Sequence, residues 1–295
     1  MTEPALVVHS GAGNIPDEMT AAILDGCELA AAEALRILQA RNCELDAVEG
    51  AVRIMEDDPV FDAGRGSHLN RNGKVEMDAI IMDGATLNAG AIATVEQVRY
   101  PITLARRVMD DTEHIMIIGE GAEQFARQKG LEHKPANWFV VEREYEGWRK
   151  GLSLYGQATY LGTIGCVARD SDGGLAVATS TGGTANKIPG RVGDSPLIGS
   201  GGFADNQNAA VSATGWGDSL MAVVMNKTTC DFVNNGINSQ DAADAAIRLL
   251  IDRVGGSGGV IVVDHNGLPG VAFNTQRMAR AWIDHDGEIR SAIDD

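Results

Sequence analysis

The chain has 295 residues, of which 36 are glycine, 8 are proline and 44% are hydrophobic, and its formal net charge at pH 7 is −17. A glycine content above the usual ~7%, without a repeat and with few prolines, excludes a collagen-like or low-complexity chain, while the hydrophobic fraction can fill a large core. The negative charge argues against a nucleic acid or an anionic membrane as partner, because the long-range field would repel both.

Cysteine usage and the N-terminal sequence bear on the compartment. Cys27, Cys43, Cys166 and Cys230 lie far apart and form no Cys-x-x-Cys pair, which argues against a zinc site and a disulfide framework. The N-terminal residues include an acid and an apolar run too short for a signal peptide, and no apolar stretch approaches the ~18 residues that span a bilayer. We therefore expect a cytoplasmic protein that does not enter a membrane.

The first half of the chain predicts a first strand, then helices, and further strands in a glycine-rich region. The apolar run at 5–9 leads into Ser10 and three further small residues, which is typical of a buried strand opening into a tight turn. Residues rich in Ala, Leu and Glu predict the next two helices, and Pro59 stops the second. The expected strands are 5–9, 77–82 and 89–95, and the expected helices are 17–39, 44–57, 101–111 and 121–128.

The second half changes to a β pattern. Residues 134–160 carry charge, aromatic side chains and no clear period, so we expect a linker there. The expected strands after it are 163–170, 174–181, 208–214, 260–264 and 270–274, and the expected helices are 218–225 and 239–253. Helices, strands, strands and helices in this order are typical of a layered α+β protein with two sheets in its core. Strict βαβ alternation is absent, as is a glycine-rich phosphate loop between a strand and a helix.

The strands 163–170 and 174–181 flank a turn of the Asp/Gly kind, which predicts a hairpin. If its centre is Asp172, paired residue numbers sum to 344 and Thr163 faces Thr181 across the ladder, at the ~5 Å typical of opposed Cβ atoms. A bulge at Gly173 would shift this register by one residue. Two opposed threonines have a purely structural reading as well, since such pairs stabilise sheets.

Two further groups of residues are suited to substrate binding or catalysis. Arg191 and Asp194 lie three residues apart in a glycine-flanked loop, where a guanidinium can clamp a carboxylate and a carboxylate can receive an ammonium; the alternative is a surface ion pair of little energetic value. Thr214 and Gly215 end a strand with a hydroxyl next to a flexible backbone amide. Such a pair suits an oxyanion hole.

Several short sequence segments, in the same order along the chain, resemble those of one known family. Together they resemble the plant-type (type III) L-asparaginase and isoaspartyl aminopeptidase family of N-terminal-nucleophile hydrolases, nearly end to end. The resemblance implies a single domain, 1–295, folded as a four-layer αββα sandwich. The blocks are HSGAG at 9–13, FDAGRG at 61–66, MDAIIMDGATLNAG at 77–90, GTIGCV at 162–167, TSTGG at 179–183, GRVGDSP at 190–196 and ATG at 213–215.

The resemblance implies that Thr163 is the nucleophile. It would become an N-terminus when the chain cleaves itself between Gly162 and Thr163, giving an α chain, 1–162, with a linker at about 134–162, and a β chain, 163–295. A threonine hydroxyl is a poor nucleophile, and a free α-amine with a pKa of about 8 is a base within its reach. In the intact chain the same nitrogen belongs to a peptide bond and cannot act as a base, so cleavage would activate the enzyme. Thr181 would hold the Thr163 side chain in place.

The substrate-binding roles follow from the same resemblance. Arg191 would bind the α-carboxylate of the substrate, Asp194 its α-ammonium with help from the Gly217 carbonyl, and Thr214 and Gly215 the oxyanion. The expected activity is hydrolysis of L-asparagine and of β-aspartyl dipeptides, without a catalytic cofactor, in a homodimer of αβ units. The alternatives are an N4-glycosylasparaginase and a catalytically idle aspartate-binding relative.

The resemblance also implies a structural sodium ion and shows two departures. Position 62 is Asp where we expect Asn near the nucleophile, and Ser10 stands where relatives often carry glycine. Both bear on the efficiency of self-cleavage, since a carboxylate near the Thr163 amine alters its pKa. The expected sodium ligands are the backbone carbonyls of Met55, Glu56, Asp58, Phe61, Ala63 and Arg65.

Overall fold

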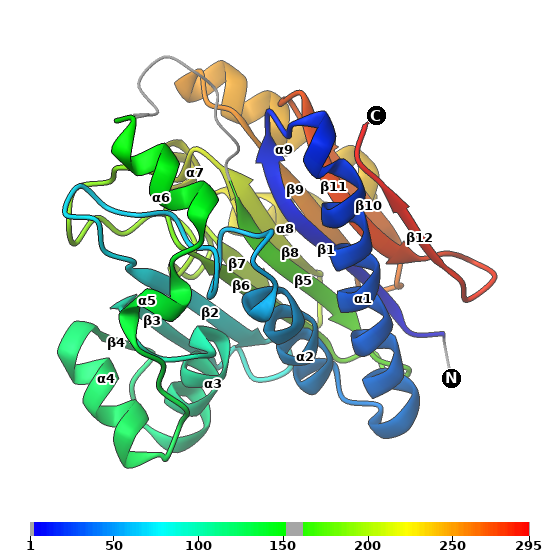
Figure 1. Ribbon diagram of the computed structural model, residues 1–295. Helices are drawn as coiled ribbons and strands as arrows, with labels where there is room; N and C mark the ends of the chain where they lie inside the picture. Colours follow the sequence, from blue (N-terminus) through cyan, green and yellow to red (C-terminus); the bar gives the residue numbers. More distant parts are fainter. Residues whose placement is uncertain (1–2, 152–161, 295) are drawn as a thin grey trace.

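Figure 1 shows the computed structural model, which describes residues 3–151 and 162–294. These residues form two sheets that lie face to face. The strands of the larger sheet are β1 (Ala5–Gly13), β2 (Met77–Asp83), β3 (Ala89–Val95), β4 (Met116–Ile118), β5 (Thr163–Arg169), β6 (Leu175–Thr181), β11 (Arg277–Ile283) and β12 (Ile289–Ala292). The smaller sheet contains β7 (Gly202–Ala204), β8 (Ala209–Gly215), β9 (Gly258–Asp264) and β10 (Pro269–Phe273).

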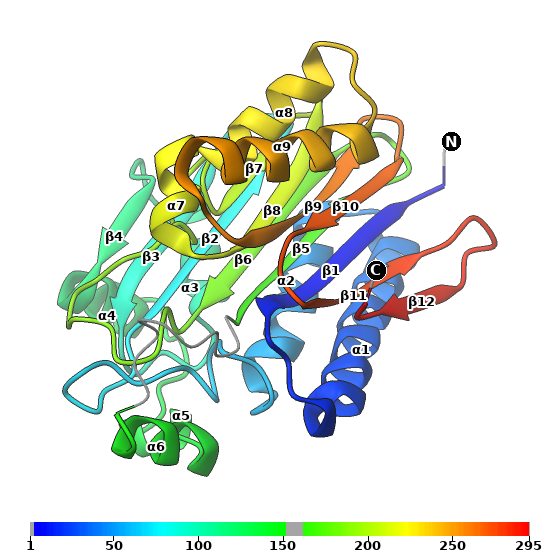
Figure 2. The ribbon, with the colours of Figure 1, turned by 90° about the horizontal axis from the view of Figure 1, so that it is seen from above.

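The larger sheet has the order β12-β11-β1-β5-β6-β2-β3-β4, and the smaller has the order β10-β9-β8-β7. Helices cover the outer face of each sheet, and the two inner faces pack together, as β5 against β8 and β1 against β9 (Figure 2). The first group of helices is α1 (Asp17–Arg41), α2 (Glu44–Asp57) and α3 (Pro101–Asp111), and the second is α7 (Gly217–Val223), α8 (Met225–Asn234) and α9 (Ser239–Val254). This is the four-layer αββα sandwich that the sequence predicted.

Burial explains why the central strands read as continuous apolar runs. Every residue of β5 and β6 is buried, as expected for strands covered by a helix layer on one side and a second sheet on the other. The helices meet the sheets through small side chains: Ala30, Ala31 and Ala34 of α1 are fully buried. Among the helices of the described residues, none is long and apolar enough to cross a membrane.

The hairpin register is confirmed. Strands β5 and β6 pair in antiparallel register from Thr163↔Thr181 to Arg169↔Leu175, with no shift at Gly173. The first strand is longer than the expected 5–9, because β1 continues to Gly13 through an irregularity between His9 and Ala12, where Gly11 has φ +114°. The predicted turn is therefore a bulge within the strand.

The segment expected to be a linker begins with two short helices, α5 (Ala136–Phe139) and α6 (Glu142–Arg149). Tertiary contacts hold them: Phe139 is fully buried, and its carbonyl accepts a hydrogen bond of 2.9 Å from the amide of Gly66. The part of the expected linker at 152–161 lies outside the described residues. Other elements that the sequence did not predict are β4, β7, β11, β12 and α8, and α4 (Gly119–Gln128) begins two residues early.

Candidate active site

One small pocket gathers nearly all the residues predicted for cleavage, catalysis and substrate binding. It lies where β5 begins at Thr163, β6 ends at Thr181 and β8 ends at Gly215. The predicted residues that line it are Gly162, Thr163, Thr181, Arg191, Asp194, Gly215 and Gly217, and the others are Gly183, Thr184, Gly193 and Ser195. Segments up to 55 residues apart in the sequence thus meet at one end of the two sheets.

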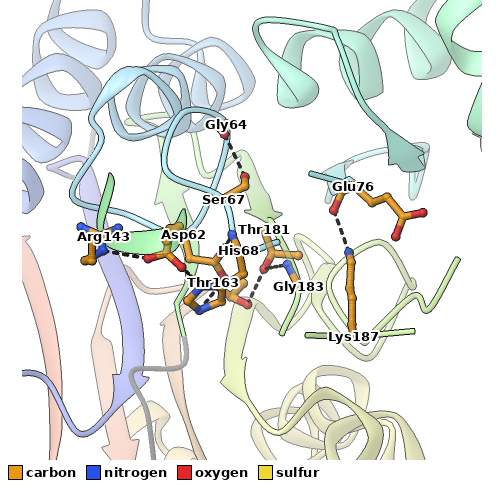
Figure 3. Close-up of polar contacts among 11 residues, drawn as sticks. Asp62, Gly64, Ser67, His68, Glu76, Arg143, Thr163, Thr181, Gly183 and Lys187 are labelled. Carbon is orange, nitrogen blue, oxygen red and sulfur yellow. Dashed lines mark hydrogen bonds and ion pairs between the residues drawn. The ribbon is translucent and has the colours of Figure 1, made fainter. Parts of the chain in front are cut away.

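The two threonine hydroxyls are hydrogen-bonded to each other at the base of this pocket. Thr163 Oγ1 donates to Thr181 Oγ1 over 3.2 Å, and the amide of Gly183 donates to the same Thr181 oxygen over 2.9 Å (Figure 3). Thr163 is 8% exposed and Thr181 3%. The Gly183 bond fixes the Thr181 hydroxyl, which in turn fixes the rotamer of Thr163, so this pair does more than stabilise the ladder.

Arg191 and Asp194 face the pocket as two separate charges. The Arg191 guanidinium donates from Nη2 to Asp218 Oδ2 over 2.6 Å. Asp194 is buried, and its Oδ2 has no hydrogen-bond partner among the described residues. Burial raises the pKa of Asp194 to about 7, and the nearby Arg191 opposes the rise. Within the described residues Arg191 is therefore paired with Asp218 at the surface, and it forms no ion pair with Asp194.

Gly217 separates the two charges. A Cβ atom at this position would lie 2.6 Å from Asp194 Oδ1 and 3.1 Å from Arg191 Nη2, so only glycine fits between them. A guanidinium and a carboxylate that are not paired with each other thus flank a bare backbone, which matches the two charges of an α-amino acid.

Thr214 does not line the pocket, but it directly precedes Gly215, which does. The Thr214 hydroxyl is fully buried and has no hydrogen-bond partner within the described part of the chain. Gly215 has φ +141°, and a Cβ atom there would lie 2.4 Å from Gly258 Cα. An unpaired buried hydroxyl thus lies next to Gly215, whose backbone borders the same pocket as Thr163, and such a pair of donors suits an oxyanion hole.

A buried ionisable cluster lies beside the threonine pair, and sequence reasoning found only one of its members. His68 Nδ1 and Glu144 Oε2 are 2.5 Å apart, and His68 Nε2 lies 3.6 Å from Asp62 Oδ2. The Asp62 carbonyl accepts a hydrogen bond of 3.0 Å from the amide of Gly182, the neighbour of Thr181. Figure 3 shows Asp62 and His68 next to Thr163. The unexpected Asp at position 62 therefore has a basic partner in the same site.

The charges in this cluster support one another. Burial alone would lower the pKa of His68, but Asp62 and Glu144 outweigh it and raise the pKa to about 9. Burial acts to raise the pKa of Glu144, yet His68 and Arg143 bring it down to about 2. Burial raises the pKa of Asp62 to about 7 against the opposing effect of His68. A protonated His68 between two carboxylates follows from these directions.

The loop expected to hold sodium is tightly folded. Gly64 has φ +53°, and a Cβ atom there would lie 2.2 Å from the Glu56 carbonyl oxygen. Of the expected ligands, the carbonyls of Met55, Glu56 and Asp58 accept backbone hydrogen bonds of 3.3, 2.7 and 3.3 Å. For the carbonyls of Phe61, Ala63 and Arg65, no hydrogen bond is formed within residues 3–151 and 162–294.

Comparisons with known proteins agree with the geometry. The profile of the family described as asparaginase matches residues 2–293. The Homo sapiens protein named isoaspartyl peptidase/L-asparaginase is 45% identical over 297 residues, which cover 99% of this chain and 96% of its own length. The Danio rerio protein of that name is 44% identical over 283 residues (94% and 91%), and the Xenopus laevis protein is 42% identical over 288 residues (96% and 93%). This chain belongs to the asparaginase family.

Proposed function

We propose that this protein is a threonine amidohydrolase that converts L-asparagine to L-aspartate and ammonia and cleaves β-aspartyl dipeptides, after cleaving itself between Gly162 and Thr163. The names of its relatives, isoaspartyl peptidase/L-asparaginase, support both reactions. The observation that carries the proposal is the hydrogen bond between the hydroxyls of Thr163 and Thr181, in a pocket that also presents Arg191 and Asp194.

Self-cleavage supplies the base. In the intact chain the nitrogen of Thr163 belongs to a peptide bond and takes no proton. After cleavage it is an α-amine with an ordinary pKa of about 8, and it lies within reach of its own hydroxyl. The amine accepts the hydroxyl proton as Thr163 Oγ1 attacks, while Thr181 holds the side chain in the attacking rotamer.

The remaining groups bind the substrate and its developing charge. Arg191 holds the α-carboxylate, and Asp194, with the Gly217 carbonyl, holds the α-ammonium. This places the side-chain carbonyl of the substrate over Thr163. The Thr214 hydroxyl and the Gly215 amide stabilise the oxyanion of the tetrahedral intermediate.

The reaction then proceeds by covalent catalysis. Collapse of the tetrahedral intermediate breaks the carbon–nitrogen bond, and the protonated amine returns its proton to the leaving ammonia or amino acid. A β-aspartyl ester remains on Thr163. Water attacks this ester, again with the amine as base, and releases aspartate. The chain's own amine, hydroxyls and backbone amide supply every step, so the proposal needs no catalytic cofactor.

We infer a structural sodium ion in the loop before β2. The unbonded carbonyl oxygens of Phe61, Ala63 and Arg65 are donors of the kind that a hard cation prefers. With the expected carbonyls of Met55, Glu56 and Asp58 they would tie together the loop that carries Asp62. The ion would supply rigidity and no chemical step.

Two further features complete the proposal. All four cysteines are free, which supports a reducing compartment such as the cytoplasm. The family resemblance supports a homodimer of processed αβ units. The alternatives are less favoured: the Homo sapiens, Danio rerio and Xenopus laevis relatives are named isoaspartyl peptidase/L-asparaginase, and an idle aspartate-binding protein would have no use for the proposed nucleophile and oxyanion groups that this chain keeps.

The proposal is tested with a substrate panel. Ammonia release from asparagine and aspartate release from β-aspartyl-leucine should both occur with the purified protein and be absent with Thr163→Ala. A glycosylasparagine should be the poorest substrate. Faster hydrolysis of the glycosylasparagine than of asparagine would favour the alternative enzyme, and activity in Thr163→Ala would exclude the proposed nucleophile.

A further inference from the structure

Glu76, immediately before β2, holds the loop that carries Arg191. Its carboxylate accepts hydrogen bonds from the amide of Gly190, over 3.0 Å to Oε1 and 3.1 Å to Oε2. Its backbone carbonyl accepts a hydrogen bond of 2.7 Å from Lys187 Nζ (Figure 3). Glu76 is 8% exposed and Lys187 4%. One residue therefore binds both ends of the segment 187–190.

The same segment is fixed on its other side by backbone contacts. The amide of Arg71 donates to the Lys187 carbonyl over 2.9 Å, and the amide of Asn186 donates to the Leu69 carbonyl over 2.8 Å. The Lys187 ammonium also lies against Gly183, where a Cβ atom would be 2.7 Å from Nζ. The loop is thus anchored on residues 69–76, which precede the proposed cleavage site.

The Glu76 bond bears directly on the position of Arg191. Gly190 has φ +82°, a conformation that turns the chain sharply just before Arg191. The amide of Arg191 then donates to the Ile188 carbonyl over 2.9 Å, which closes the turn. Without the Glu76 carboxylate, the Gly190 amide loses its acceptor in the protein and the turn loses one of its two constraints.

We propose that Glu76 is a positioning residue that sets the Arg191 guanidinium for the α-carboxylate of the substrate. This inference rests on the proposed function of the same pocket and deepens it. Under that proposal Glu76 belongs to the α chain and Arg191 to the β chain. The α chain, which donates no nucleophile, thereby determines the preference for substrates with a free α-carboxylate.

The test separates binding of the α-carboxylate from chemistry. In Glu76→Ala, KM for asparagine should rise at least about tenfold, since misplacing a binding group by an ångström or less is costly, while kcat stays within about twofold of the parent. Inhibition constants give the second readout. Aspartate, which has the α-carboxylate, should inhibit less strongly by the same factor, and 3-aminopropanoate, which lacks it, should inhibit equally in both proteins.

Two further variants guard against a purely structural effect. Glu76→Gln keeps a carbonyl acceptor for the Gly190 amide and should restore KM to within about threefold of the parent. Glu76→Asp withdraws the carboxylate by one methylene and should give an intermediate KM, which provides the result if Glu76→Ala fails to fold.

Glu123 offers a matched control. It is a buried glutamate whose Oε1 accepts the amides of Glu96 and Gln97 over 2.8 and 2.9 Å, away from the pocket. Glu123→Ala should lower stability as Glu76→Ala does but leave KM unchanged.

Equal weakening of aspartate and 3-aminopropanoate binding in Glu76→Ala, or an unchanged KM, would overturn the role of Glu76. Failure of the parent protein to hydrolyse asparagine would instead contradict the proposed function, so the two failures are distinguishable.

Discussion

The Thr163 hydroxyl donates a hydrogen bond of 3.2 Å to the Thr181 hydroxyl, between the first paired residues of the β5–β6 ladder. Because the Gly183 amide also donates to Thr181 Oγ1, the acceptor is held from two sides. For Thr163 as the proposed nucleophile, a rotamer fixed in this way requires little reorganisation before attack.

Removing that acceptor should impair chemistry. We expect Thr181→Val, which keeps the side-chain shape, to lower kcat for asparagine by about 10² to 10³, as loss of a positioned catalytic hydrogen bond does, while Thr181→Ser retains most of the rate. Thr229→Val is the control, because Thr229 is equally buried but bonds only to the Met225 carbonyl. Equal kcat in the parent and Thr181→Val would contradict the assigned role.

Substrate binding should depend on pH through Asp194. Its pKa is raised to about 7 by burial, so the carboxylate is ionised above that pH and protonated below it. A neutral Asp194 attracts the substrate ammonium less, and KM for asparagine should therefore rise as the pH falls below about 7. The measurement is KM between pH 5.5 and 8.5. In Asp194→Asn, KM should be high throughout and should not change over this range; a flat profile in the parent protein would refute the prediction.

The bare backbone at Gly217 should be required for binding. Gly217→Ala would place a methyl group 2.6 Å from Asp194 Oδ1, and we expect KM to rise at least about tenfold as the two charged groups are displaced. Gly147, in α6, has nothing within 4 Å of its Cβ position. Gly147→Ala should leave KM unchanged and add about 0.5–1 kcal/mol of stability. Normal kinetics in Gly217→Ala would show that the charges lie elsewhere when substrate binds.

His68 should stabilise the intact protein. In His68→Gln, Glu144 and Asp62 lose a buried cation, and we expect the free energy of unfolding to fall by about 3 kcal/mol. Since the pKa of His68 is raised to about 9 in the folded state from 6.5, its stabilising effect is complete below about pH 6.5 and is lost as the pH rises through about 9.

Urea unfolding of both proteins from pH 6 to 9.5 measures this change. His133→Gln is the control, because His133 is a partly exposed histidine that lies 3.2 Å from a different carboxylate, that of Glu123. A difference between parent and His68→Gln that grows with pH would contradict the assignment.

Short-range sequence patterns predicted the elements whose structure depends on neighbouring residues. The hairpin centred on Asp172 follows from turn residues and period-two strands, and its register places Thr163 opposite Thr181 as expected. Edge strands such as β4 and β12 have only 3 and 4 residues, and too few side chains to show a period. Helix α6 has no fully buried residue, and its two large apolar side chains, Tyr145 and Trp148, are too few to show a helical period in the sequence.

The structure places Arg191 and Asp194, which were predicted from their chemistry, in one pocket; Thr214, predicted in the same way, does not line it. The residues that hold these side chains in place could not be predicted from the sequence. Asp218 binds Arg191 from 27 residues away, and Glu144 reaches His68 across 76 residues. These contacts depend on how the layers pack, and sequence spacing carries no trace of such packing. The pairing of Asp62 with His68 was unpredictable for the same reason, since of these two residues only Asp62 departs from the expected pattern.

The central claim is that Thr163 becomes an N-terminus. The most direct measurement is the intact mass of the purified protein over time, beside that of Thr163→Ala. The parent chain should be replaced by fragments of residues 1–162 and 163–295 as asparaginase activity appears, and Thr163→Ala should stay whole and inactive. A chain that remains uncleaved while it hydrolyses asparagine, or a cut at another bond, would contradict this claim.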